Sequence, residues 1–284
     1  MALQGLTTET NASNNEVALI NEYVTGPPAE ALLTRCGLLK TQTTSPAPLR
    51  LLDNATGIGT LIFRLLGSKA YIQIDQIIGA DIDVSYLSFL RERASKHAHS
   101  SIEALQLDQQ APGLDSDSFD YIFNNFGVFF ASDDEAVLKE THRMLKSGGF
   151  AGFTSWAKIS WWDEILIPAL ERYAPDAPPL PHPSKLFAPR GWTDPQSTKV
   201  RLESAGFRDV EAEIWAFTPD VDPKDFAMAC THLVKAISAR AWSEQDRGRF
   251  EPRIEQAFLD YLNNTFEGGR WTGKMSAVLT WGKK

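Results

Sequence analysis

The chain has 284 residues, is 43% hydrophobic and carries a formal net charge of −8 at pH 7. A chain of this length can bury a full core, so we expect one domain with a lid. The acidic balance and the lack of a basic run argue against a nucleic-acid surface, which requires clustered Lys and Arg. Cys36 and Cys230 are too few for a disulfide framework or a zinc cluster. Without an apolar leader or a membrane-length apolar run, we expect a soluble, cytoplasmic protein that makes no membrane contact.

A strand, a tight turn and a helix are predicted near residues 49–67. An apolar run ends at Asp53, small residues follow, and Gly57 and Gly59 lie in the predicted turn. Glycine lets backbone amides approach a ligand, and the following helix directs its electropositive N-terminus to the same place. No Gly-Lys-Ser/Thr follows, as a Walker turn requires, and Ala55 stands where a dinucleotide turn has glycine. A different nucleotide-like cofactor is therefore predicted here.

A second acid ends the next predicted strand. Residues 77–80 are small or apolar, and Asp81 follows them. A carboxylate in that position suits the two hydroxyls of a ribose, because it can accept a hydrogen bond from each. The rest of the core alternates, with strands near 102–107, 119–125 and 150–156 and helices near 84–97 and 133–146. This alternation predicts parallel strands with a ligand at their carboxyl ends.

In their order and spacing, the two acid-ended strands and the later segments 117–127 and 145–154 resemble the class I methyltransferases that use S-adenosylmethionine. More closely, the chain is similar to the ubiquinone-biosynthesis-type branch. Within that branch, the runs Asn125–Phe130 and Leu138–Gly149 are similar to fungal natural-product enzymes of the gliotoxin thiomethyltransferase type. The resemblance covers residues 45–157 firmly and the remainder loosely, and it is specific for fold and cofactor but not for substrate.

The resemblance implies an α/β fold: a Rossmann-like, seven-stranded, mostly parallel sheet with helices on both faces and helical lid insertions. We expect an N-terminal cap segment at 1–48 and a cofactor-binding core at 49–156. Residues 157–284 would complete the sheet and form the substrate pocket, with lid insertions near 157–195 and 219–270. The last two strands are expected to pair antiparallel at one sheet edge.

Two flanking segments are expected to be helical. Residues 16–36 contain helical stretches that we expect to break at Gly26-Pro27-Pro28, because proline lacks the amide hydrogen that a helix interior uses. Residues 161–173 predict an amphipathic helix with large apolar side chains, and a proline-rich loop follows it to residue 195.

The resemblance also implies residues for S-adenosylmethionine. Asp53 would order the turn and reach the methionine end of the cofactor, although on the residues alone it could instead cap a helix. Asp81 would accept from the ribose and Ile82 would pack on the adenine. Asp108 and Gln109 are similar to a pair that meets the adenine amino group, with an exposed turn as the alternative. The expected cofactor residues are Asp53, Asn54, Ala55, Gly57, Gly59, Asp81, Ile82, Asp108, Gln109 and Asn124.

The methyl acceptor is expected at the end of the strand near 119–125. Two amides, Asn124 and Asn125, end this buried strand, where polar groups require partners. One is expected to face the cofactor and the other, with Phe126, to border the acceptor. Aromatic residues are dense in the second half, either as core packing or as walls for a flat apolar acceptor: Trp156, Trp161, Trp162, Phe187, Trp192, Trp215 and Phe217. The expected substrate residues are Asn125, Phe126, Trp156 and Trp161.

Few side chains are candidates for a catalytic acid or base. His182 in the proline-rich loop, His232 in an inserted helix and Tyr23 in the cap segment are weak candidates. A thiol or phenol acceptor that ionises near neutral pH would need only correct positioning, whereas an aliphatic hydroxyl or protonated amine would need a base. No His, Cys, Asp and Glu spacing predicts a metal site. The other histidines are expected on the surface: His97, His99 and His142.

These features predict an S-adenosylmethionine-dependent methyltransferase acting on O, S or N of a small, aromatic or heterocyclic natural product of fungal secondary metabolism. A second hypothesis is an isomerase or pericyclase on the same fold, with the cofactor as a structural or electrostatic element. A third is a non-catalytic binding protein, against which Asp81 and the intact glycine turn argue. The expected partner is the small-molecule substrate, and the chain is expected to be a monomer or a homodimer.

Overall fold

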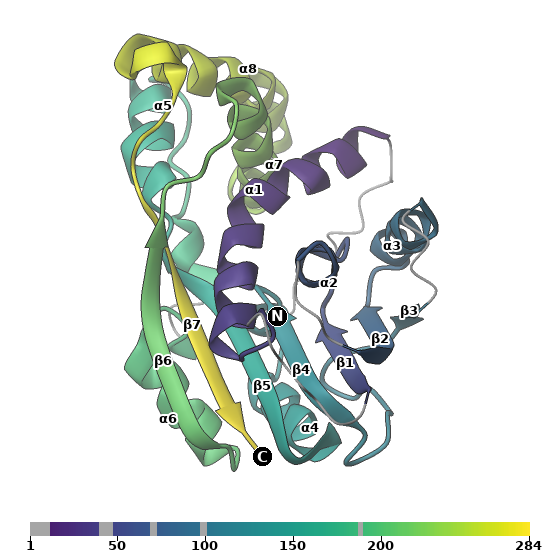
Figure 1. Ribbon diagram of the computed structural model, residues 1–284. Helices are drawn as coiled ribbons and strands as arrows, with labels where there is room; N and C mark the ends of the chain where they lie inside the picture. Colours follow the sequence, from purple (N-terminus) through teal and green to yellow (C-terminus); the bar gives the residue numbers. More distant parts are fainter. Residues whose placement is uncertain (1–11, 40–47, 69–72, 97–100, 187–189) are drawn as a thin grey trace.

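The computed structural model describes residues 12–39, 48–68, 73–96, 101–186 and 190–284. Seven strands form one sheet in the order β3-β2-β1-β4-β5-β7-β6 (Figure 1). The predicted fold class is confirmed. The strands are β1 (Leu49–Asn54), β2 (Ile74–Asp81), β3 (Ile102–Gln106), β4 (Phe119–Asn125), β5 (Leu145–Lys158), β6 (Arg208–Phe217) and β7 (Met275–Lys283).

The first five strands are parallel, and β7 runs antiparallel to both β5 and β6. The predicted antiparallel pair at one edge of the sheet is therefore confirmed. In the parallel part, Asp53 on β1 pairs with Gly79 on β2, and Asn125 on β4 pairs with Thr154 on β5. This register brings the polar carboxyl ends of β1, β2, β4 and β5 to one edge of the sheet.

Helices cover both faces of the sheet (Figure 1). On one face lie α1 (Ala12–Arg35), α2 (Thr60–Leu66) and α3 (Val84–Lys96), and on the other α4 (Asp134–Met144) and α6 (Pro195–Ser204). Side-chain caps begin several helices: the carboxylate of Asp133 accepts from the Ala136 amide, and that of Asp194 accepts from the Ser197 amide. By contrast, α2 begins at Gly59 with no side-chain cap.

A second group of helices stands beyond the carboxyl ends of the parallel strands (Figure 1). It has its own apolar interior, in which Phe226 stacks on Trp271 with ring centres 5.7 Å apart and meets Phe258 edge-on. Both predicted insertions contribute, and we refer to this group as the lid. The lid elements are η2 (Trp162–Leu166), α5 (Ile167–Tyr173), η3 (Pro183–Leu186), α7 (Pro223–Ala241), α8 (Glu244–Thr265) and η5 (Glu267–Gly269).

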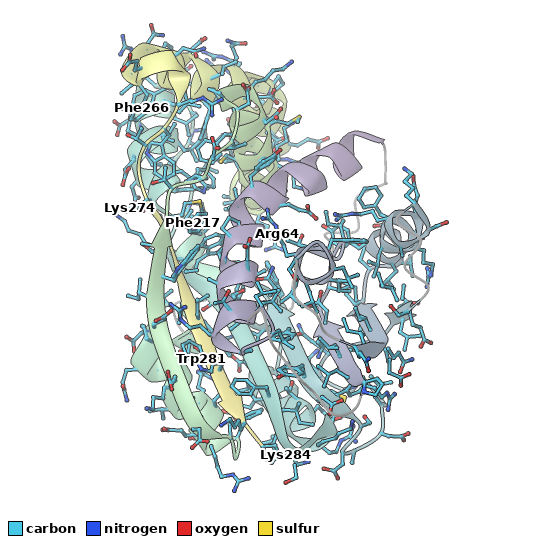
Figure 2. All side chains as sticks on the ribbon, viewed as in Figure 1. Arg64, Phe217, Phe266, Lys274, Trp281 and Lys284 are labelled. Carbon is cyan, nitrogen blue, oxygen red and sulfur yellow. The ribbon has the colours of Figure 1, made fainter. Side chains whose placement is uncertain are left out.

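Two helix predictions differ from the structure. The prediction of a break at Gly26-Pro27-Pro28 is wrong, because α1 continues through both prolines and bends in the middle instead (Figure 1). The Arg64 guanidinium packs on Gly26, where a Cβ would lie 2.6 Å from it, and this contact supports the bend (Figure 2). The predicted helix 161–173 divides into a π-helical turn, η2, followed by α5. No helix of the described residues is both long and apolar enough to cross a bilayer.

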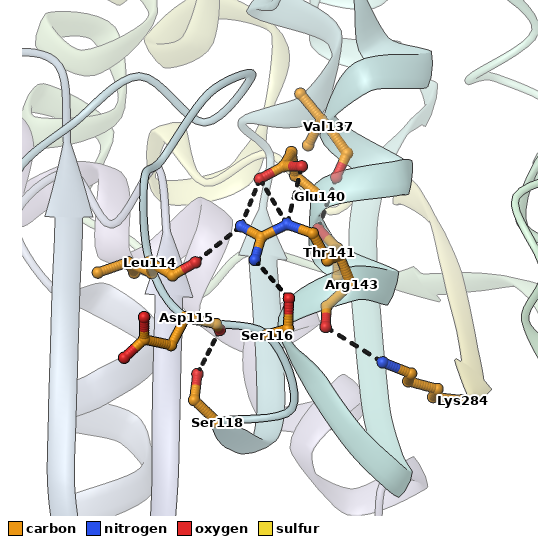
Figure 3. A network of polar contacts seen from close by, with 9 residues as sticks. All are labelled: Leu114, Asp115, Ser116, Ser118, Val137, Glu140, Thr141, Arg143 and Lys284. Atoms are coloured by element: carbon orange, nitrogen blue, oxygen red, sulfur yellow. Dashed lines mark hydrogen bonds and ion pairs between the residues drawn. The ribbon is translucent and has the colours of Figure 1, made fainter.

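A polar network anchors the opposite end of the sheet. The Arg143 guanidinium donates to the Leu114 carbonyl at 2.7 Å, to Ser116 and to Glu140 on its own helix (Figure 3). Lys284 donates to the Arg143 carbonyl, which ties the residue after β7 to the end of α4. These contacts belong to the scaffold, because they lie at the edge opposite the carboxyl ends of the parallel strands.

Candidate functional site

The turn after β1 is held by its own acid. Asp53 is 2% exposed, and its Oδ2 accepts from the Thr56 hydroxyl at 2.7 Å. The Thr56 amide donates across to the Ala80 carbonyl at the end of β2. Thr56, which the sequence interpretation left without a role, therefore links the two acid-ended strands. Its place three residues after a strand-end acid is the signal that could have identified it.

Asp81 ties the same turn to the end of β2. Its Oδ2 accepts from the Gly57 amide at 2.8 Å, and its Oδ1 accepts from the Asp83 amide at 3.0 Å. Burial raises the pKa of this carboxyl, and the two backbone donors oppose that shift. Each oxygen keeps a second lone pair, so Asp81 can still accept from the two hydroxyls of a ribose.

The residues of the turn with positive φ have different neighbours. Gly57 has φ +54° and a Cβ there would meet nothing within 4 Å, so open space lies beside its backbone. Gly59 has φ +84°, but a Cβ would lie 2.6 Å from Leu90, so this glycine allows α2 to pack on α3. Ala55 is left-handed at φ +61° and its methyl group faces Gly127. Of the three, Gly57 is thus the position with room for a ligand.

Buried polar atoms without partners gather at the end of β1. Asp53 Oδ1 and both amide atoms of Asn54 have no hydrogen-bond partner within the described part of the chain. Burial, together with the nearby Asp81 charge, raises the pKa of Asp53 to about 7, while the Thr56 bond opposes the rise. A cation or a hydrogen-bond donor beside Asp53 would relieve this cost. These features fit the polar, positively charged methionine end of S-adenosylmethionine.

The adenine end is expected beyond Asp81. Ile82 is 61% exposed, which is unusual for an isoleucine following a buried strand and is suited to covering by a flat ring. The Asp108 carboxylate accepts from the amide and side chain of Gln110. Gln110 in turn accepts from Ser132 and from the Asp133 amide. Asp108 is thereby fixed at the end of β3, where the sequence placed it.

Asn124 and Gln109 bind one another. Asn124 Nδ2 donates to Gln109 Oε1 at 2.7 Å, while Asn124 Oδ1 accepts from the Gly127 amide at 3.0 Å. Gln109 Nε2 completes the ring by donating to the Gly127 carbonyl at 3.1 Å. The amide of Asn124 thus finds its partners at the end of β4, as a buried amide must. One N–H of each amide remains available for a ligand.

Asn125 and Phe126 form a strained corner after β4. Phe126 has φ +59°, a costly conformation for an aromatic residue. Its amide donates to the Thr154 hydroxyl at 2.9 Å, and that hydroxyl donates to Asn125 Oδ1 at 2.8 Å. Asn125 Nδ2 reaches the Thr25 carbonyl of α1. Thr154, which sequence reasoning missed, holds the corner. The available signal was a hydroxyl that follows the apolar residues of β5.

The ring of Phe126 stacks on Trp156 with ring centres 4.2 Å apart. Phe126 is 7% exposed and Trp156 is half-buried near the end of β5, so Trp156 is the member of this pair that a ligand can reach. Trp161, the fourth expected substrate residue, is buried between Trp162 and Phe258 inside the lid. Its contacts are those of core packing.

The other aromatic candidates divide in the same way. Trp192 is fully buried and donates to Asp134 at 2.6 Å, so it packs the core. Trp215 and Phe217 stack on one another along the edge strand β6 with ring centres 5.1 Å apart. Phe187, His97 and His99 lie outside the described residues.

The candidate bases differ in their surroundings. His182 Nδ1 accepts from the Ser184 amide at 3.1 Å, so the neutral ring carries its hydrogen on Nε2, which lies 3.7 Å from Asp163. Both ring nitrogens thus face groups of the lid. Burial lowers the pKa of His182 and of His232, so both rings are neutral at pH 7. The ring of Tyr23 is half exposed on α1.

Two other features lie outside this site. A surface cavity of about 500 Å³ between α4 and α6 is lined by Leu138, Lys139, Val200 and Arg201, among others, on the far face of the sheet from α2. In the described ranges, no group of three or more His, Cys, Asp or Glu side chains could hold a metal ion.

The fold and this strand-end site define a class I methyltransferase. Comparison with known proteins agrees: residues 36–188 match the ubiE/COQ5 methyltransferase family, and the chain belongs to that family. It is an S-adenosylmethionine-dependent methyltransferase.

Fungal methyltransferases are similar over nearly the whole chain. Methyltransferase tpcH of Aspergillus fumigatus is 25% identical, covering 90% of this chain and 91% of tpcH. The acetylaranotin bis-thiomethyltransferase of Aspergillus terreus is 26% identical, and the match covers 86% of this chain and 84% of that enzyme. A Bacillus halodurans crystal structure assigned as a methyltransferase shares the fold, with a TM-score of 0.51 and 16% identity. The match covers 90% of this chain and 98% of the Bacillus halodurans chain.

Proposed function

We propose that this methyltransferase acts on a small, planar aromatic or heterocyclic natural product with O, S or N as the acceptor atom. The observation that carries the proposal is the Phe126–Trp156 stack beside Asn125, which offers an aromatic face with an amide at its edge. The similarity to a bis-thiomethyltransferase that acts on acetylaranotin supports a natural product as substrate. A flat acceptor would lie against this face.

The proposed cofactor residues surround one place. Asp81 would accept from the ribose, Ile82 would cover the adenine, and Asp53 would lie at the methionine end. The backbone at Gly57 would allow close approach, and Asn124 would donate its remaining N–H. When bound, S-adenosylmethionine supplies a methyl group activated by its sulfonium charge.

The protein's part in the reaction is positioning. Phe126 is fixed by its bond to Thr154, so the aromatic face keeps a set orientation relative to the end of β4. The lid and α1 would cover this edge and exclude water. Holding the reacting atoms in line at about 3–3.5 Å removes much of the barrier without further chemistry from the protein.

Among these acceptors, a thiol or phenol that ionises near neutral pH would lose its proton to solvent, so no side chain would have to take it. This agrees with the ring nitrogens of His182 facing Ser184 and Asp163. His182, His232 and Tyr23 remain the places to test for an acceptor with a higher pKa.

The test uses Trp156→Ala, with Trp156→Phe as the matched control that keeps an aromatic ring. Trp156→Ala is expected to raise KM for aromatic thiols and phenols about tenfold and to leave S-adenosylhomocysteine affinity within about twofold, since burying one ring contributes on the order of 1.4 kcal/mol. Equal KM values for aromatic and aliphatic thiols in the wild type would contradict the substrate class. Substrate conversion without release of S-adenosylhomocysteine would support the pericyclase alternative.

The wider setting is also part of the proposal. We propose a cytoplasmic enzyme of fungal secondary metabolism, acting as a monomer or homodimer without a nucleic-acid partner. Its functional division would follow the cap segment 1–48, the core 49–156 and the lid-bearing part 157–284. Light scattering of the purified protein would give the oligomeric state.

A further inference from the structure

An ion pair joins the N-terminal helix to the far helix of the same face. Glu22 Oε1 on α1 lies 2.5 Å from Arg93 Nη1 on α3, and their side chains are 20% and 13% exposed. The sequence positions are 71 residues apart. Such a shielded pair is screened less by salt than a surface pair and holds its geometry better. It fastens α1 to α3.

The same arginine contacts the cofactor turn. Arg93 Nη1 also donates to the Ile58 carbonyl at 2.9 Å, and its guanidinium lies over the Phe63 ring at 4.1 Å. Ile58 stands between Gly57 and Gly59, the residues whose left-handed backbone shapes the turn. One nitrogen therefore binds both α1 and the turn, and the position of either affects the other.

Glu22 makes two further contacts with α2. Its Oε1 accepts from the Thr60 hydroxyl at 3.4 Å, and its backbone carbonyl accepts from Arg64 at 3.2 Å. Arg64 packs against the bend of α1 at Gly26 (Figure 2). Both contacts link α1 to α2.

We propose that Glu22 and Arg93 form a clasp that closes α1 over the cofactor turn and fixes the Ile58 carbonyl, so that they act as positioning residues for cofactor binding. This inference rests on the proposed cofactor site. A cofactor that enters at the strand ends must pass the edge that α1 covers. The bend of α1 at Gly26-Pro27-Pro28 would allow its N-terminal half to swing without disturbing Ala29, Leu32 and Leu33, which are packed in the core.

The clasp predicts a specific pattern of effects. Breaking it should weaken cofactor binding and speed cofactor exchange, while the chemical step, carried by the β4 and β5 ends, is little changed.

The experiment compares Glu22→Ala with Glu30→Ala. Glu30 is the matched control, because it also pairs α1 with α2, but its carboxylate meets Arg64, at 3.4 Å, and not Arg93. Glu22→Ala is expected to raise the S-adenosylhomocysteine dissociation constant about tenfold in calorimetry, with KM for S-adenosylmethionine rising and kcat within about twofold. Amide exchange of residues 22–26 in the ligand-free protein should accelerate. Glu30→Ala should change each quantity by less than about twofold.

A charge swap separates the two halves of the clasp. Glu22→Arg with Arg93→Glu restores the α1 pair but places a carboxylate near the Ile58 carbonyl, so α1 protection should return and cofactor affinity should stay low. Unchanged affinity and unchanged exchange in Glu22→Ala would overturn the inference. So would a fall in kcat with constant KM, which would indicate a role in the chemical step. A wild-type protein that bound no S-adenosylhomocysteine would instead refute the proposed site, while the exchange data would still decide whether the clasp exists.

Discussion

Gly127 and Ala55 meet where the turn after β1 faces the end of β4, and this contact makes a sharp prediction. A Cβ at residue 127 would lie 2.4 Å from the Ala55 methyl group and 2.9 Å from Asn124 Oδ1. Gly127 has φ −106° and ψ −30°, which any residue adopts. The substitution Gly127→Ala therefore introduces a steric conflict and no backbone strain.

The size of the effect follows from these distances. Real Cβ atoms essentially never approach within 3.0 Å, so the turn or the end of β4 has to move. Overpacking of this kind costs about 1–3 kcal/mol. For a chain of this size, each kcal/mol lowers Tm by about 2–4 °C. Because the displaced atoms include Ala55 and Asn124, S-adenosylhomocysteine affinity should also fall.

Thermal unfolding and calorimetry of a double-mutant cycle provide the assay. Ala55→Gly removes the opposing methyl group and relieves a left-handed alanine, so it should recover most of the stability that Gly127→Ala loses. Gly248→Ala is the control: this exposed glycine lies inside α8 with nothing within 4 Å, so alanine there should stabilise by about 1 kcal/mol. Equal destabilisation by Gly127→Ala in both backgrounds would refute the steric argument.

Three further changes test other parts of the structure. Thr154→Val leaves the Phe126 amide and Asn125 Oδ1 without their partner, so the free energy of unfolding should fall by about 1–3 kcal/mol and kcat/KM should fall with it. Wild-type stability and wild-type kcat/KM in this variant would contradict the role of Thr154 in holding the corner after β4. Asp53→Asn should gain stability relative to the wild type from pH 5 to 8 in thermal melts. With a pKa of about 7 for Asp53, the folded wild type binds more protons than the unfolded chain between about pH 4 and 7, so the stability of the wild type falls as pH rises. A difference between the two proteins that does not change with pH would show that the pKa is ordinary. Arg143→Met removes scaffold hydrogen bonds, so the free energy of unfolding should fall by about 1–2 kcal/mol and Tm by a few degrees, without a change in S-adenosylhomocysteine affinity. Weaker affinity would mean that the two ends of the sheet are coupled.

Local patterns sufficed for the core of the fold. Apolar runs ending in Asp53 and Asp81 predicted β1 and β2 to within a few residues, because buried parallel strands need continuous apolar residues and strand ends do not. The alternation of strands and helices then predicted the parallel sheet. The course of α1 through Pro27 and Pro28 was not predictable, since it is supported by Arg64 from a different helix.

Residue types alone determined which side chains could serve a cofactor: two strand-end acids, a small-residue turn and paired amides. The tertiary structure decided what each one contacts. Gly57 and Gly59 look alike in sequence, yet only Gly57 has open space beside it, because Leu90 from α3 fills the other. Thr154 and Arg93 gained their roles from residues 29 and 35 positions away. The sequence therefore shows which chemical groups the chain carries, whereas packing between distant segments determines which of these groups come into contact.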